Sequence, residues 1–134
     1  MPEPEFTAAQ AQALLDEVIR ALAERLVALR TGAEPMRRRW QQMVIAIGSN
    51  GGGLDKSEAE KLRETLERAQ SEAAEILDEI RSHGVQVKDP DRGLLDFPTV
   101  IEGRPALLCW QVGEERIEFW HTEEDGFAGR RPIE

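Results

Sequence analysis

Two long helical repeats separated by a glycine-rich break constrain the fold of this chain more than any other feature. Between residues 7 and 47, apolar side chains recur at steps of three and four, the spacing that places them along one face of a helix. Residues 55–83 repeat this spacing, with glutamates and arginines at most other positions. The glycines at 51–53 favour a helix end and a chain reversal. Residues 1–84 are therefore predicted to form a long antiparallel, coiled-coil-like α-helical hairpin.

The predicted helices, at about 7–47 and 55–83, have recognisable ends and one internal irregularity. Thr7 and Gln10 have the spacing of a capping box, and Gly84 suits a glycine C-cap. Pro35 removes one backbone hydrogen bond and clashes with the preceding turn, which predicts a kink near residues 31–35. We favour one kinked helix because the apolar spacing keeps its phase through Pro35, and a break into two helices is the alternative.

The first predicted helix is longer than the second, roughly 60 Å against 44 Å at 1.5 Å per residue. Residues 6–18 then extend past the second helix, and the chain that follows residue 84 must cover their apolar side. From Val85 onward the apolar period changes to two, with turn signals between short segments. Residues 85–134 are predicted to form a small antiparallel β meander packed on the start of the first helix. The expected fold class is α+β.

The last two predicted strands, 106–112 and 115–121, decide which side chains can meet. We predict a two-residue turn at Gly113 and Glu114, in which Glu114 is only a turn residue. This turn places Trp110 on the same face as His121 and puts Cys109 on the opposite face from His121, which weakens a Cys/His metal site. A four-residue loop preserves these faces, whereas a three-residue loop swaps the faces of one strand.

The candidate site lies where the predicted β head meets the start of the first helix. Its lining residues are Asp96, Trp110, Glu118, Trp120, His121 and Arg130. We expect His121 to be held by one carboxylate, for which the candidates are Asp96 and, in the following loop, Glu123, Glu124 and Asp125. Two alternatives use the same pair: a divalent transition metal held by His121, Asp96 and a nearby acid, or acid–base catalysis. Cys109 is expected to be a small buried apolar residue, and Arg130 to pair with surplus acids.

The overall charge and the apolar pattern restrict the possible partners. A net charge of −9 argues against nucleic acid, and no apolar run is long enough to span a membrane. The run from Met43 to Ile47 is apolar all round its helix, which predicts a homodimer through the hairpin tip. Burial of this run within a chain broken at Pro35 is the alternative. The single cysteine and the absence of a signal-peptide pattern predict a cytoplasmic protein.

Several short motifs in the C-terminal half carry a resemblance to a known family. They are NGGG at 50–53, GV at 84–85, KDPDRGL at 88–94, DFP at 96–98, LCW at 108–110, GE at 113–114, WH at 120–121 and GFAGR at 126–130. With these motifs the chain resembles an uncharacterised prokaryotic family, domain of unknown function 2203. The resemblance covers nearly the whole chain and implies no activity.

Taken together, these patterns favour a non-enzymatic binding or assembly module without a resident cofactor, whose small-molecule or protein ligand the sequence does not identify. The alternative is a metal-dependent enzyme or a metal carrier that uses His121 and Asp96.

Overall fold

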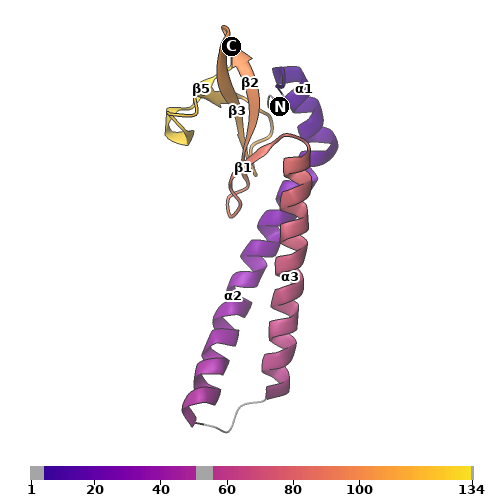
Figure 1. The fold of residues 1–134 in the computed structure, drawn as a ribbon, viewed down its shortest axis with the longest axis vertical. Coiled ribbons are helices and arrows are strands. Elements are labelled where there is room, and N and C mark those ends of the chain that lie inside the picture. Colours follow the sequence, from indigo (N-terminus) through magenta and orange to yellow (C-terminus); the bar gives the residue numbers. More distant parts are fainter. Residues whose placement is uncertain (1–4, 51–55, 134) are drawn as a thin grey trace.

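The structure is a computed structural model that describes residues 5–50 and 56–133. It is an α+β fold in which two long helices lie beside each other and carry a five-stranded sheet at one end (Figure 1). The predicted fold class is confirmed. Most of the predicted glycine-rich turn lies in residues 51–55, outside the described residues.

The first helical segment comprises α1 (Ala8–Leu14), a π-helical turn η1 (Leu15–Ile19) and α2 (Arg20–Asn50). The capping box at its start is confirmed: the Thr7 hydroxyl accepts from the Gln10 backbone N–H at 3.1 Å, and the Gln10 side chain accepts from the Thr7 N–H at 2.9 Å. Pro35 lies inside α2, which continues as one helix on both sides of it. The kink at Pro35 stays a prediction.

The second long helix, α3 (Lys56–Ser82), runs back beside α2, and α1 extends past its end (Figure 1). The predicted glycine C-cap is confirmed because Gly84 has a φ of 87° and its N–H donates to the Arg81 carbonyl oxygen at 2.9 Å. This left-handed conformation directs the chain out of the helix and into the sheet.

The sheet is an antiparallel meander in the order β1-β2-β3-β4-β5. Its strands are β1 (Gln86–Asp89), β2 (Leu94–Ile101), β3 (Arg104–Gln111), β4 (Phe119–His121) and β5 (Arg131–Pro132). A short 3₁₀ turn, η2 (Phe127–Gly129), precedes β5. Successive strands are neighbours in the sheet, as the predicted sequence of short strands and turns requires.

One face of the sheet closes the hydrophobic core against the helices. Leu95, Phe97, Leu108 and Trp110 are buried together with Leu15, Ile19, Leu26, Ile76 and Ile80. Residues 6–18 are in contact with the sheet: the Phe6 N–H donates to the Pro98 carbonyl oxygen at 2.7 Å, and the Thr99 hydroxyl donates to the Phe6 carbonyl oxygen at 2.6 Å. The residue before the Thr7 cap is therefore fixed to β2 by one main-chain and one side-chain hydrogen bond as well as by apolar packing.

Candidate functional site

The register of the last strands differs from the predicted one. Leu107 is paired with His121, and Cys109 with Phe119, whereas the predicted two-residue turn placed Cys109 opposite Glu118. Residues directly opposite each other share a face, so Cys109 and His121 lie on the same side of the sheet. Trp110 belongs to the other face. The predicted separation of Cys109 and His121 was wrong, and so was the shared face of Trp110 and His121.

The physical reason is that residues 112–118 leave the sheet instead of forming a tight hairpin. The Ile117 N–H donates to the Gln12 side-chain oxygen at 2.9 Å, and Arg20 donates to the Glu115 carbonyl oxygen at 2.6 Å. These contacts with the first helical segment replace cross-strand hydrogen bonds. Because side chains alternate along a strand, a shift of one residue in the pairing turns every β4 side chain to the other face.

The shift brings three polar side chains together on the face of the sheet turned away from the helices, which we call the outer face. Asp96 on β2 is directly paired with Cys109 on β3, and His121 on β4 lies beside them. The Asp96 carboxylate, the Cys109 sulfur and a His121 ring nitrogen all lie within 4.8 Å of one another. Asp96 is 1% exposed, Cys109 0% and His121 3%, so the cluster is removed from solvent.

The two ring nitrogens of His121 have different partners. Nδ1 lies 2.7 Å from the Thr122 carbonyl oxygen, which can only accept, so Nδ1 carries a proton and donates it. Nε2 lies 2.9 Å from Asp96 Oδ1. One proton is shared between Nε2 and the carboxylate, which makes His121 and Asp96 a buried hydrogen-bonded pair, as the sequence suggested.

Burial also sets the protonation of the other two groups. Removal from water raises the pKa of Asp96, against the lowering effect of the charge and hydrogen bond of His121. Burial raises the pKa of the Cys109 thiol to about 12, and the neighbouring Asp96 charge acts in the same direction. The thiol therefore stays protonated at neutral pH in this arrangement, which argues against a cysteine nucleophile.

Arg130 covers one side of this cluster. Its guanidinium lies 4.2 Å from the Phe119 ring centre and 4.7 Å from that of Phe127. It donates to both carboxylate oxygens of Glu114, at 2.7 and 2.8 Å, and more weakly to the Cys109 carbonyl oxygen at 3.4 Å. The expected pairing of Arg130 with an acid is thus present. Glu114, predicted to have no role beyond its turn, is the acid.

The six residues predicted to line one pocket are divided between the two faces. Asp96, His121 and Arg130 lie together near Cys109. Trp110 is buried in the core on the helix side, with its ring N–H donating to the Glu114 carbonyl oxygen at 2.9 Å, and Trp120 packs against that core. Glu118 lines a separate cavity of about 700 Å³ beside α1. Of the six predicted residues, Asp96 and His121 belong to the cluster and Arg130 lies at its side, and the structure adds Cys109 to the cluster.

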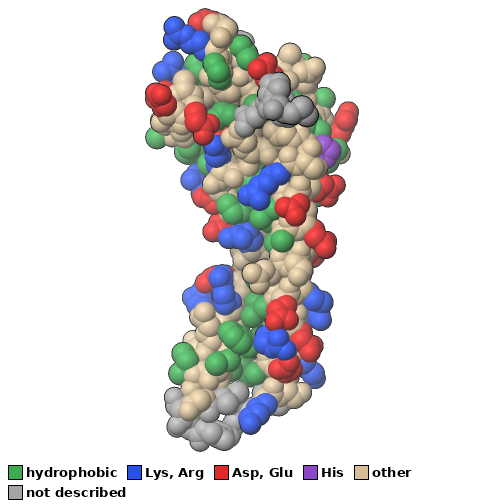
Figure 2. Space-filling view, viewed as in Figure 1, with side chains coloured by type: hydrophobic (Ala, Val, Ile, Leu, Met, Phe, Trp, Pro, Cys, Tyr) green, Lys and Arg blue, Asp and Glu red, His purple; other side chains and the backbone are tan. Residues whose placement is uncertain are grey.

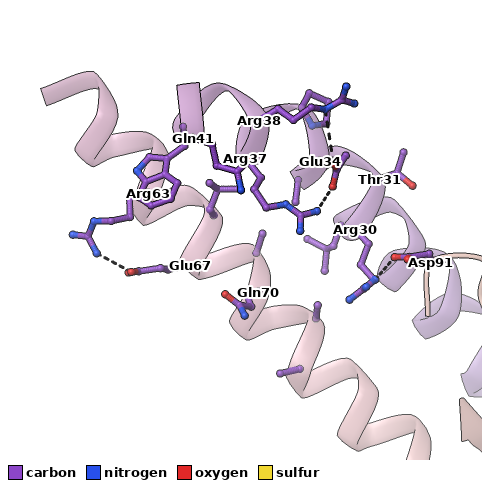
Figure 3. A pocket seen from close by; sticks show the side chains of 18 of the residues that line it. Arg30, Thr31, Glu34, Arg37, Arg38, Gln41, Arg63, Glu67, Gln70 and Asp91 are labelled. Carbon is purple, nitrogen blue, oxygen red and sulfur yellow. Dashed lines mark hydrogen bonds and ion pairs between the residues drawn. The ribbon is translucent and has the colours of Figure 1, made fainter. Parts of the chain in front are cut away.

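A second candidate site lies on the helices. A cavity of about 1230 Å³ opens between α2 and α3 (Figure 3). Its apolar lining includes Leu29, Ala33 and Trp40 from α2 and Leu66, Ala69 and Leu77 from α3, all of them partly exposed. Figure 2 shows hydrophobic side chains at the surface here, between acidic and basic ones. We call this part of the two helices, residues 29–50 and 56–77, the arm.

The end of the arm also has apolar side chains at its surface. Met43 is buried, but Val44 is 43% exposed and Ile45 is 67% exposed. The side chain of Ile47, the last residue of the predicted apolar run, lies outside the described residues. Among the described residues, no helix is both long enough and apolar enough to cross a membrane.

Comparison with known proteins identifies a family for this chain. A family model described as an uncharacterized conserved protein, DUF2203, matches residues 5–133. No curated protein and no solved structure matches the chain. The match covers both the helices and the sheet, so it applies to the cluster and to the arm alike.

Proposed function

Because the chain belongs to the DUF2203 family, whose description names no activity, we propose a function from the structure: it is a non-enzymatic assembly module whose arm pairs with the arm of a second copy. The observation that carries this proposal is the partly exposed apolar seam between α2 and α3.

The seam contrasts with the other end of the same helices. Near the sheet, outside the arm, Leu26 and Ile80 are buried because the sheet provides a third layer over the two helices. Along the arm, Leu29, Leu66 and other seam residues are partly exposed, since two helices alone cannot cover both sides of their contact. A second arm would supply the missing layer and complete a four-helix arrangement.

The charges along the arm favour a second copy over an unrelated partner. Residues 30–41 of α2 contain four arginines and one glutamate, while residues 58–72 of α3 contain five glutamates and three basic residues. A two-fold axis parallel to the arm would place the basic edge of each copy on the acidic edge of the other, which makes the surface self-complementary.

The ion pairs now present in the arm do not oppose this exchange. Arg37 and Arg38 pair with Glu34, and Arg39 pairs with Glu58, all with exposed side chains. Exposed pairs of this kind contribute about 0–1 kcal/mol each, so exchanging them for contacts between copies costs little. The exposed Val44 and Ile45 extend the apolar surface towards the tip, where the sequence predicted a dimer contact.

The proposal is tested by measuring the mass in solution with light scattering after size exclusion, at concentrations from about one to one hundred micromolar, the usual range for weak to moderate association. We expect the mass of two chains. Ala69→Glu, which puts a charge into the cavity lining, should give a monomer with unchanged helical content by circular dichroism. Ala28→Glu is the matched control, because Ala28 is exposed on α2 and is not part of that lining. A monomeric wild-type chain over this range contradicts the proposal.

The same proposal assigns the module to the cytoplasm and gives it no catalytic role. Its single cysteine, Cys109, is buried as a free thiol, which suits a reducing compartment. The six residues predicted to line one pocket are divided between separate places, and we therefore propose the arm as the assembly surface.

A further inference from the structure

The three buried polar side chains on the outer face of the sheet could have a role that is independent of the arm. We propose that Asp96, Cys109 and His121 bind a divalent transition-metal ion, with zinc the best fit, through the carboxylate, the thiolate and Nε2. Carboxylate, sulfur and imidazole together form a mixed donor set that first-row ions such as zinc and cobalt accept, whereas magnesium and calcium require oxygen ligands.

The spacing of the three ligand atoms supports this proposal. Around a tetrahedral zinc ion with bonds of about 2.0–2.3 Å, ligand atoms are about 3.3–3.8 Å apart. The three atoms here lie within 4.8 Å of one another, and Nε2 is 2.9 Å from Asp96 Oδ1. Small side-chain rotations, without a change in the strands, would bring the three atoms to this spacing.

The sheet holds the three ligands in place. Asp96 and Cys109 are cross-strand partners on β2 and β3, and His121 is on β4, the next strand. Ligands on adjacent paired strands keep their spacing better than ligands on loops, because the main-chain hydrogen bonds fix the register. This arrangement exists only in the observed register, since a pairing shifted by one residue would turn His121 away.

His121 is also oriented as metal-binding histidines usually are. Its Nδ1–H donates to the Thr122 carbonyl oxygen, which fixes the tautomer and leaves the lone pair of Nε2 for an ion. The hydrogen bond between Nε2 and Asp96 would be replaced by two bonds to the same ion.

The charge balance of the cluster favours a divalent ion as its occupant. Without an ion, the cluster holds one proton on the Cys109 sulfur and one between Asp96 and His121, and it is neutral. With a divalent ion, the thiolate and carboxylate balance the two positive charges, His121 is neutral, and two protons are released. The buried site is neutral in both states, so binding leaves no uncompensated charge in the interior.

A metal at this position would join β2, β3 and β4 and hold the C-terminal segment against the sheet. Because all three ligand residues are at most 3% exposed, a substrate could not reach the ion in this conformation. The ion is therefore proposed as structural. A set of three hydrogen-bonded side chains with no ion is the competing explanation.

Titration of chelator-treated protein with zinc or cobalt separates the two explanations. We expect one ion per chain, about two protons released per ion in weakly buffered solution, and a thiolate-to-cobalt charge-transfer band in the cobalt form. Cys109→Ala should abolish this band, and His121→Ala should weaken binding at least about tenfold to a hundredfold, the loss caused even by supporting residues at metal sites.

The chain provides a matched control, because His83 is its only other histidine. His83→Ala should bind the ion as the wild type does. If a variant at His121 fails to fold, Cys109→Ser retains the size of the side chain and gives the same comparison through the loss of the charge-transfer band. Absence of stoichiometric binding to the wild-type chain, or equal losses in the His83 and His121 variants, would overturn the proposal. Neither result bears on the oligomeric state, which is measured separately.

Discussion

At the scale of single residues, Arg130 shows why a side chain distant in sequence can complete a site. It stacks on Phe119 and Phe127 and bonds to Glu114, so it connects the C-terminal segment to the turn after β3. A planar guanidinium can stack and donate two hydrogen bonds at once, which a lysine cannot do. The acidic composition predicted that Arg130 would find a carboxylate. The identity of that carboxylate depended on a turn whose path the sequence did not reveal.

Gly93 is a second residue with a specific physical role, between β1 and β2. Its φ is +63°, and an added Cβ would lie 2.3 Å from Val112 Cγ2 and 2.9 Å from Val27 Cγ2. Gly103 also has a positive φ, +77°, but an added Cβ there meets nothing within 4 Å. The two positions therefore differ in available space while sharing the left-handed conformation.

This pair gives a prediction for stability. Gly93→Ala should lower the free energy of unfolding by about 1–3 kcal/mol more than Gly103→Ala, because overpacking is added to the cost of the backbone conformation. Urea denaturation of the two variants and the wild type measures the difference. Equal losses at the two positions would mean that Val27 and Val112 move aside without cost.

At the scale of elements, the arm part of α2 contains two residues that weaken a helix, Gly32 and Pro35. Pro35 is exposed and lacks the N–H that would bond within the helix, and Gly32 has open space around it. The helix continues through both residues because the contacts of its apolar side chains with α3 outweigh the low helix propensity of glycine and proline.

Alanine substitutions at these two positions should change the free energy of unfolding by different amounts. Pro35→Ala should raise the free energy of unfolding by up to about 3 kcal/mol, and Gly32→Ala by about 0.5–1 kcal/mol, as their helix propensities indicate. Thermal or urea denaturation followed by circular dichroism at the helix band gives both values. A loss of stability in Pro35→Ala would show that a bend at the proline is required for the packing of the arm.

At the scale of the whole molecule, the two ends of the helices are in different situations. At one end, the sheet packs on the two helices, and all three elements contribute to the hydrophobic core. At the other end, the apolar residues between α2 and α3 are partly exposed and line a cavity. Isolated helical hairpins are protected weakly where few apolar side chains are buried. The oligomeric state therefore affects the arm far more than the sheet.

Hydrogen exchange can measure this contrast directly. If two arms pair, backbone amides in residues 29–45 and 59–77 should exchange more slowly as the protein concentration rises through the association range. Amides in β2 and β3 serve as the internal control and should exchange at the same rate throughout, because these strands lie in the core beside the helices. Arm amides that do not respond to concentration would contradict the pairing.

The local patterns of the sequence were sufficient to predict the helices and the β meander. The three-and-four spacing predicted two long helices, Thr7 and Gln10 predicted the first cap, and the change of period at Val85 predicted the β meander. These features depend on residues a few positions apart, and the physical chemistry of such neighbours is the same in any fold. Asp96 was one of the acids that the sequence offered as a partner for His121, and the hydrogen bond between these two side chains is present.

Tertiary structure decided the composition of the site. The backbone of residues 115–117 bonds to Gln12 and Arg20, about a hundred positions earlier in the chain, and this shifts β4 by one residue against β3. Because a one-residue shift reverses every side chain of a strand, it moved His121 to the side of Cys109 and left Trp110 on the other face. The alternation along each strand was determined by the sequence alone. The face that β4 presents was set by long-range hydrogen bonds that no local pattern contains.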